Sequence, residues 1–136
     1  MALLETQAFA PRPIHRIIAG GAMLFGVMTV FSGGNVIFGP EAARELAGQF
    51  VPFVVWFNFS AGFFYIAAGL AIWRGHRFAM WLSIAIAAAT ALVAAAFALW
   101  VMQGGGYEMR TVGALTLRFG IWALISLVLL RTIART

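Results

Sequence analysis

Four long apolar runs constrain the fold of this chain more than any other feature. They cover residues 14–32, 51–73, 78–102 and 112–130, and short polar segments separate them. Because a helix rises about 1.5 Å per residue, about 20 residues cross a hydrocarbon core about 30 Å thick. Each run is therefore long enough to cross a membrane as a helix. We therefore predict an all-α fold, a transmembrane four-helix bundle, forming a single membrane domain over residues 1–136.

The composition agrees with a membrane location. The chain is 63% hydrophobic and only 10% charged, and it has no cysteine, which excludes a disulfide framework and a thiolate metal site. Its formal net charge is +5. All the basic residues other than histidine are arginines, and nearly all lie near the ends of the apolar runs. This placement favours contact with lipid headgroups over nucleic acid.

The arginines are distributed unequally between the two sides of the predicted bundle. One side has Arg44 and Arg110, together with the carboxylates of Glu41, Glu45 and Glu108. The other side has six: Arg12, Arg16, Arg74, Arg77, Arg131 and Arg135. Since cytoplasmic loops carry an excess of arginine and lysine, we expect both termini to be cytoplasmic.

The first outer loop, residues 39–48, has the signals of a short interfacial helix. Pro40 suits its first turn, Glu41 suits the positive end of its dipole, and Gly48 suits a left-handed stop. Just before this loop, the glycines at 33–34 and Asn35 indicate that the helix of the first span becomes irregular.

Arg118 is the only charged residue predicted inside a span. It lies about seven residues into the fourth run, about 9 Å below its outer end. It either extends to the outer headgroups or faces the bundle interior, where it needs acceptors. Glu108, Glu41 and Glu45 are the carboxylates on that side. We predict that Arg118 points inwards and pairs with Glu108, with Asn58 nearby.

Together these residues define a predicted polar cluster on the outer side. Arg118 is its anchor, Asn58 and Asn35 line it, and Tyr107 and Arg110 form its rim. The interpretation we favour is structural: the cluster holds the outer loops against the bundle. The alternative is a pocket for a quinone or a lipid headgroup.

Small residues recur at helical spacing in the third run and predict a smooth interface, because small side chains let membrane helices approach closely. These residues are Ser83, Ala87, Ala91, Ala94 and Ala98. His15 and His76 lie at the cytoplasmic boundary, where we expect headgroup contact rather than haem ligation. We find no metal-ligand cluster and no catalytic motif, so no catalytic residue is nominated and no cofactor other than a quinone or lipid is suggested.

Several of these features resemble the DoxX-like group of small bacterial membrane proteins. Arg16 opens the first span ahead of the glycines at 20–21 and 26, and the second span starts at Pro52 and continues through Gly62 and residues 68–70. The resemblance covers roughly residues 16–130. It implies a four-helix bundle in a bacterial inner membrane and, for the founding members, association with quinone-linked sulfur oxidation. The resemblance does not identify any catalytic residue in this chain.

We therefore predict a small, non-catalytic protein of the bacterial inner (cytoplasmic) membrane. Its favoured role is that of an accessory, assembly or structural subunit beside a larger membrane complex, or in a homo-oligomer. The second hypothesis is a quinone- or lipid-binding redox-accessory protein. The third is a small transporter, although the first span lacks the carboxylate that small multidrug antiporters need.

Overall fold

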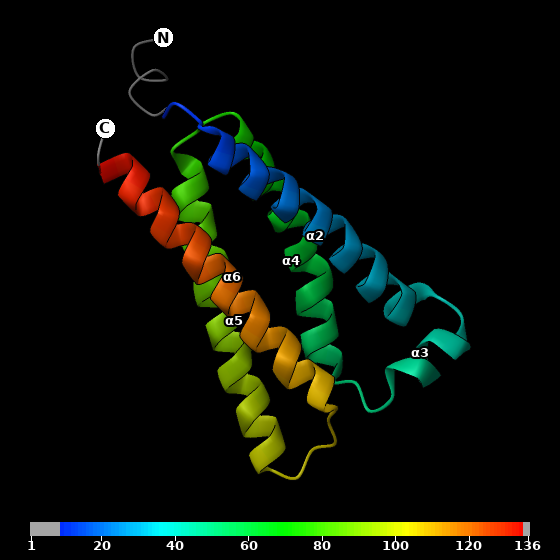
Figure 1. Cartoon of the computed structure of the whole chain (residues 1–136). Coiled ribbons are helices and arrows are strands. Elements are labelled where there is room, and N and C mark those ends of the chain that lie inside the picture. Colours follow the sequence, from blue (N-terminus) through cyan, green and yellow to red (C-terminus); the bar gives the residue numbers. More distant parts are fainter. Residues whose placement is uncertain (1–8, 135–136) are drawn as a thin grey trace.

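The computed structural model describes residues 9–134, and within this range the regular structure is entirely helical. This confirms the predicted all-α four-helix bundle with one short additional helix (Figure 1). The helices are α2 (Pro13–Phe38), α3 (Glu41–Ala47), α4 (Pro52–Trp73), α5 (Phe78–Met102) and α6 (Met109–Ala134). Arg135, which we counted for the orientation, lies outside the described residues.

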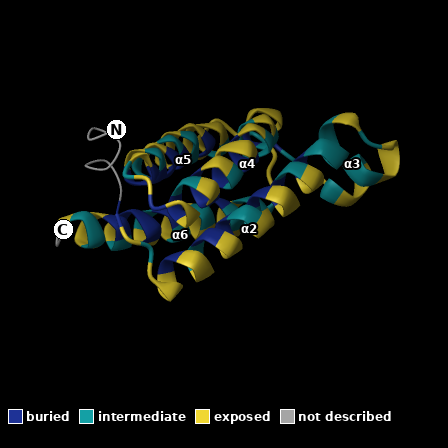
Figure 2. Ribbon diagram, turned by 90° about the horizontal axis from the view of Figure 1, so that it is seen from above, coloured by how far each residue is buried: buried dark blue, intermediate teal, exposed yellow. Residues whose placement is uncertain are grey.

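Each of the four long helices can cross a membrane. They have 26, 22, 25 and 26 residues, so they are about 33–39 Å long, against about 30 Å for a hydrocarbon core. Their outward faces are exposed (Figure 2) and carry large apolar side chains. Examples are Ile17, Leu24, Phe31, Leu92, Leu99 and Leu124. A helix that is apolar on all sides is typical of a membrane span. The chain is a multi-pass membrane protein.

The helices pack as two pairs. α2 packs extensively on α4, α6 packs on α5, and contacts between α4 and α5 join the pairs. By contrast, the backbones of α2 and α6 come close together at few positions. In Figure 1 the two ribbons diverge towards α3. The described chain begins and ends at one end of the bundle, which we call the terminal end. α3 and the α5–α6 loop lie at the opposite end, the α3 end (Figure 1).

Glycines bring α2 and α4 into close contact. A Cβ atom at Gly26 would lie 2.6 Å from the carbonyl oxygen of Gly62. One at Gly69 would lie 2.5 Å from Cγ of Met23. Lipid tails are as apolar as leucine, so this close backbone approach, rather than hydrophobicity, holds the two helices together.

The first span is longer than expected. We predicted that it loosens near residues 33–35, but α2 continues without interruption to Phe38. The glycines there serve packing instead: a Cβ at Gly33 would lie 3.0 Å from Cβ of Phe59 on α4. A continuous helix also satisfies the backbone groups that a break within a membrane would leave unpaired.

α6 also starts earlier than expected, at Met109 rather than near residue 112. Arg118 therefore lies about 13 Å along α6 from its first residue and about 5 Å from the middle of the helix. The predicted short helix in the first outer loop is confirmed as α3, which ends at Gly48 with a positive φ of 68°.

The predicted smooth face of α5 is only partly an interface. Ser83 and Ala87 are buried, but Ala91 and Ala98 are exposed and line an apolar cavity between α5 and α6. In that half of the bundle, larger side chains such as Phe97 and Leu115 fill the contact instead.

Candidate functional site

Arg118 points into the bundle, as predicted. Its Nη1 donates hydrogen bonds to Oγ1 of Thr29 on α2, at 3.0 Å, and to the hydroxyl of Tyr65 on α4, at 3.5 Å. Its Cζ lies 4.9 Å from the centre of the Phe25 ring. Thr29 and Tyr65 are buried. The guanidinium thus connects α6 to both α2 and α4, and the alternative in which it extends to the headgroups is wrong.

The surroundings of Arg118 are aromatic. Phe25 stacks on Tyr65 with ring centres 5.3 Å apart, and Tyr65 contacts Trp122 with centres 5.0 Å apart. These rings come from α2, α4 and α6. Trp122 lies one turn after Arg118, on the same face of α6. A cation against aromatic faces in a desolvated setting gains about 2 kcal/mol, which offsets part of the cost of burying the charge.

The predicted ion pair between Arg118 and Glu108 is wrong. Oε1 of Glu108 instead accepts a hydrogen bond from the backbone N–H of Gln49, at 2.9 Å. Glu108 immediately precedes α6 and lies ten positions before Arg118 in the sequence, so the two are about 15 Å apart along the helix axis. No side chain spans that separation. Proximity on the same side of the membrane was a misleading signal, because α6 starts at Met109 rather than near residue 112 and Arg118 therefore lies deeper than predicted.

Glu108 and Arg110 instead hold the loop that contains α3. Nη2 of Arg110 donates to the carbonyl oxygens of Leu46 and Ala47, at 3.0 and 3.3 Å, at the end of α3. Together with the bond from Gln49 to Glu108, these contacts attach the α3–α4 connection to the start of α6. These two members of the predicted cluster therefore hold the loop, as the structural interpretation expects.

The remaining cluster members lie apart from Arg118. Glu41 and Glu45 are exposed on α3, and Asn35 lies in the last turn of α2, where its carbonyl accepts from Gly39. The ring of Tyr107 meets that of Phe97 at 5.8 Å, edge to face. The predicted cluster is thus divided among the loop that contains α3, the end of α2 and the α5–α6 contact.

Arg118 is left without an acidic partner. Of the carboxylates in the described residues, none contacts it, and its other partners are neutral. Its Nε is buried with no hydrogen-bond partner, and so is Oδ1 of Asn58 on α4. A charged side chain at the middle of a membrane helix costs at least about 2.5–3.5 kcal/mol on insertion scales. The site therefore holds a positive charge and a free donor with nothing negative beside them.

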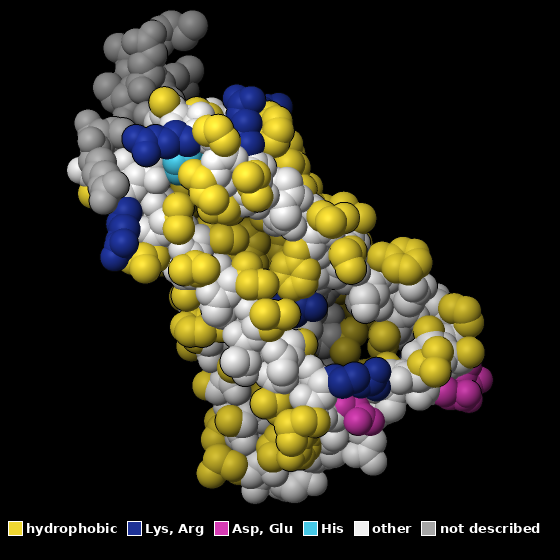
Figure 3. All heavy atoms as spheres, viewed as in Figure 1, with side chains coloured by type: hydrophobic (Ala, Val, Ile, Leu, Met, Phe, Trp, Pro, Cys, Tyr) yellow, Lys and Arg dark blue, Asp and Glu magenta, His cyan; other side chains and the backbone are white. Residues whose placement is uncertain are grey.

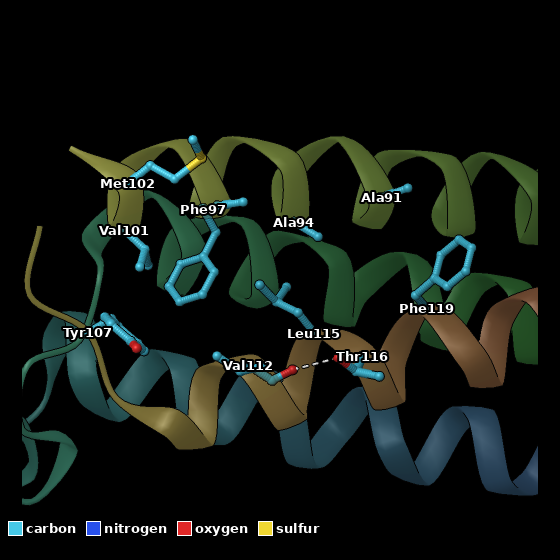
Figure 4. A pocket seen from close by; sticks show the side chains of 11 residues that line it. Ala91, Ala94, Phe97, Val101, Met102, Tyr107, Val112, Leu115, Thr116 and Phe119 are labelled. Carbon is cyan, nitrogen blue, oxygen red and sulfur yellow. Dashed lines mark hydrogen bonds between the residues drawn. The ribbon is translucent and has the colours of Figure 1, made fainter. Parts of the chain in front are cut away.

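A hollow opens between α2 and α6 on the face seen in Figure 3. Phe25, whose ring faces the Arg118 guanidinium, lines an apolar cavity of about 510 Å³ between these two helices. A separate apolar cavity of about 600 Å³ lies between α5 and α6, with Phe97, Leu115 and Phe119 in its wall and Tyr107 at its end (Figure 4). This second cavity has almost no polar lining other than the hydroxyls of Tyr107 and Thr116, and Thr116 donates to the carbonyl of Val112.

The position of His15 differs from the predicted one. We predicted headgroup contact, but His15 is buried, and its Nε2 lies 2.9 Å from Oγ1 of Thr132 on α6. Its Nδ1 accepts from the backbone N–H of Arg12, so Nε2 carries the proton and donates to Thr132. His15 and Thr132 lie near the same end of their two spans in the sequence, and this shared position is the signal from which their contact could be predicted.

Among residues 9–134, no group of three or more histidine, cysteine or acidic side chains is placed to hold a metal ion. No family model, curated protein or solved structure matches the chain. The resemblance to the DoxX-like group therefore stays a prediction from the sequence motifs.

Proposed function

We propose that this membrane protein binds a lipophilic molecule whose head group carries acceptor oxygens, such as a quinone or a lipid, with Arg118 as the anchor. The observation that carries the proposal is the guanidinium near the middle of α6 that has neutral partners only. Arginine has five N–H donors, and the contacts here come from Nη1 alone. A ligand oxygen would use the free donors and offset the charge.

The geometry favours this role over a purely structural one. A structural arginine is normally satisfied by a carboxylate or by several carbonyl oxygens, because an unpaired buried charge is strongly unfavourable. Thr29 and Tyr65 hold the guanidinium in one orientation, and Phe25 supports it from α2. Such preorganisation lowers the entropic cost of binding.

Asn58 is the second polar group assigned to this site. It lies seven residues before Tyr65, so the two share a face of α4 about 10 Å apart. Its buried, unpartnered Oδ1 is an acceptor, whereas the free group of Arg118 is a donor. A ligand with both an acceptor oxygen and a hydroxyl donor, as in a half-reduced quinone, would complement both.

The accessory-subunit role favoured by the sequence is compatible with such a site, since a lipophile-binding subunit can serve a larger complex in a bacterial inner membrane. A transporter role has less support. The described residues place no carboxylate within the four spans, and proton-coupled exchange commonly uses one.

The test is to identify what the protein retains through purification in a mild detergent. Organic extracts of the wild type, of Arg118→Met and of the matched control Arg110→Met would be analysed by mass spectrometry. Methionine keeps an unbranched apolar chain and removes the charge. We expect a lipophile in the wild type and the control, and at least about tenfold less in Arg118→Met, because a hydrogen bond to a charged group contributes about 1.5–3 kcal/mol.

Thermal unfolding of the same samples separates lost binding from lost folding. Arg118→Met should unfold at or above the temperature of the ligand-free wild type, since an uncompensated charge has been removed. Equal retention by all three proteins, or no lipophile in the wild type, would refute the proposal.

A further inference from the structure

A second polar site lies at the terminal end, between the start of α2 and the last turn of α6. A cavity of about 300 Å³ opens there, and Arg12, His15, Arg131 and Thr132 contribute its polar lining. Both arginines are exposed. Among the described residues, all carboxylates lie in the first outer loop or just before α6, at the α3 end. Of the described residues that line the cavity, the charged ones are therefore the two arginines.

This basic mouth continues into an apolar groove. A cavity of about 510 Å³ runs along the same two helices, bounded by residues such as Gly21, Phe25, Ile121 and Leu124. Ile14 and Val128 line both cavities, so the two spaces adjoin. A charged mouth followed by an apolar groove is the complement of an amphiphile with an anionic head.

The length of the groove matches one leaflet of a bilayer. From Ile14 to Phe25, α2 rises about 16 Å, which is about half of a hydrocarbon core of about 30 Å. The groove starts at the end of two membrane spans, where phosphate groups lie, and it ends near mid-membrane. An acyl chain lying along it would keep its normal depth.

The mouth is built rather than accidental. The hydrogen bond from His15 to Thr132 joins its two walls at 2.9 Å, and Thr132 in turn donates to the carbonyl of Val128 at 2.9 Å. His15 is neutral in this arrangement, so the positive charge comes from Arg12 and Arg131 on either side. The pair of helix ends is thereby held at a fixed separation.

We propose that this cleft is a binding site for one anionic phospholipid, with the phosphate between Arg12 and Arg131 and an acyl chain in the groove between α2 and α6. Basic pockets between spans are recognised as sites for anionic headgroups. The proposal does not rest on the ligand at Arg118. It concerns the part of the α2–α6 interface between Phe25 and the terminal end, and a different head-group chemistry.

Native mass spectrometry of the detergent-solubilised full chain tests this site. Phosphatidylglycerol and phosphatidylcholine with identical acyl chains would be added in turn, and bound adducts counted. We expect a single phosphatidylglycerol adduct, and about 30-fold weaker binding in the double variant Arg12→Gln/Arg131→Gln, because each basic residue contributes about fivefold. The matched control is Arg16→Gln, at the same end, whose side chain stacks on Trp73 instead.

A second variant tests the groove without touching the charges. Gly21→Leu adds a side chain at a position where a Cβ meets nothing within 4 Å, so the helix is expected to fold normally while the groove is filled. It should weaken phosphatidylglycerol binding at least about tenfold, by blocking apolar burial. Arg118→Met should leave this adduct unchanged.

Three outcomes would overturn the proposal. They are equal binding of the two lipids, an adduct that survives both the double variant and Gly21→Leu, and displacement of the lipid by millimolar inorganic phosphate, which would indicate a site for a soluble ion.

Discussion

The close contact between α2 and α4 lets us predict how Gly26→Ala changes the stability of the protein. An added Cβ would lie 2.6 Å from the carbonyl oxygen of Gly62 and 2.7 Å from Cγ1 of Ile66. Non-bonded carbon atoms prefer about 3.5–4.0 Å. The backbone nitrogen of Ile66 would be only 3.0 Å away. Because two of these three atoms belong to the backbone, a side-chain rotation cannot relieve the overlap, and Gly26→Ala must push the helices apart.

The expected loss of stability follows from two opposing terms. Overpacking a tight contact costs about 1–3 kcal/mol, while replacing glycine by alanine within a helix returns about 0.5–1 kcal/mol. The net loss for Gly26→Ala is then between about 0 and 2.5 kcal/mol. Gly20→Ala is the matched control on the same helix, because a Cβ there meets nothing within 4 Å. It should gain up to about 1 kcal/mol.

The assay is reversible unfolding in mixed micelles with increasing denaturing detergent, followed by tryptophan fluorescence. Trp122 is fully buried and reports on the core. The two variants should differ in unfolding free energy by about 1–3 kcal/mol, in opposite directions from the wild type. A difference below about 0.5 kcal/mol would refute the close contact between α2 and α4.

Three further predictions concern orientation, coupling and packing. In this cysteine-free chain, a cysteine at exposed Glu45 should react with a membrane-impermeant thiol reagent in intact cells, and one at exposed His76 should not; the reverse pattern would invert the topology. Arg118→Ala and Glu108→Ala should have additive effects on unfolding free energy, with coupling below about 0.5 kcal/mol, and larger coupling would restore the ion pair. Ala91→Leu should fill part of the α5–α6 cavity and change thermal stability little, and a large loss would show that Ala91 is a close helix contact.

Much of the fold follows from the sequence because the solvent is so restrictive. In lipid, backbone groups must be satisfied within the segment, so a long apolar run has almost no alternative to a helix. The same rule explains why the first span continues past its predicted end. Consecutive glycines at 33–34 and Asn35 would favour a break in water, yet α2 continues through them and uses Gly33 to approach Phe59.

The site was less predictable, because it depends on which helices meet and at what depth. The inward direction of Arg118 follows from the cost of exposing its charge to lipid. Its partners do not follow, since Thr29 and Tyr65 are 89 and 53 residues away in sequence and come from two other helices. Glu108 was attractive only because it is near in sequence. Because α6 starts at Met109, Arg118 lies about 15 Å along the helix axis from Glu108.

The weakest helix interface of the bundle, between α2 and α6, is also where both proposed ligands lie. α2 is held to α4 by close backbone approach, and α6 to α5 by extensive packing, but α2 and α6 come together mainly through side chains. Polar links join them at two depths: Arg118 with Thr29 near mid-membrane, and His15 with Thr132 at the terminal end. Hydrogen bonds between membrane helices contribute only about 0.6 kcal/mol on average, much less than a tight interface. An interface held in this way can admit a lipophile between α2 and α6 without separating either helix pair. Each polar link also places a charged or donor group beside the space that the lipophile would enter.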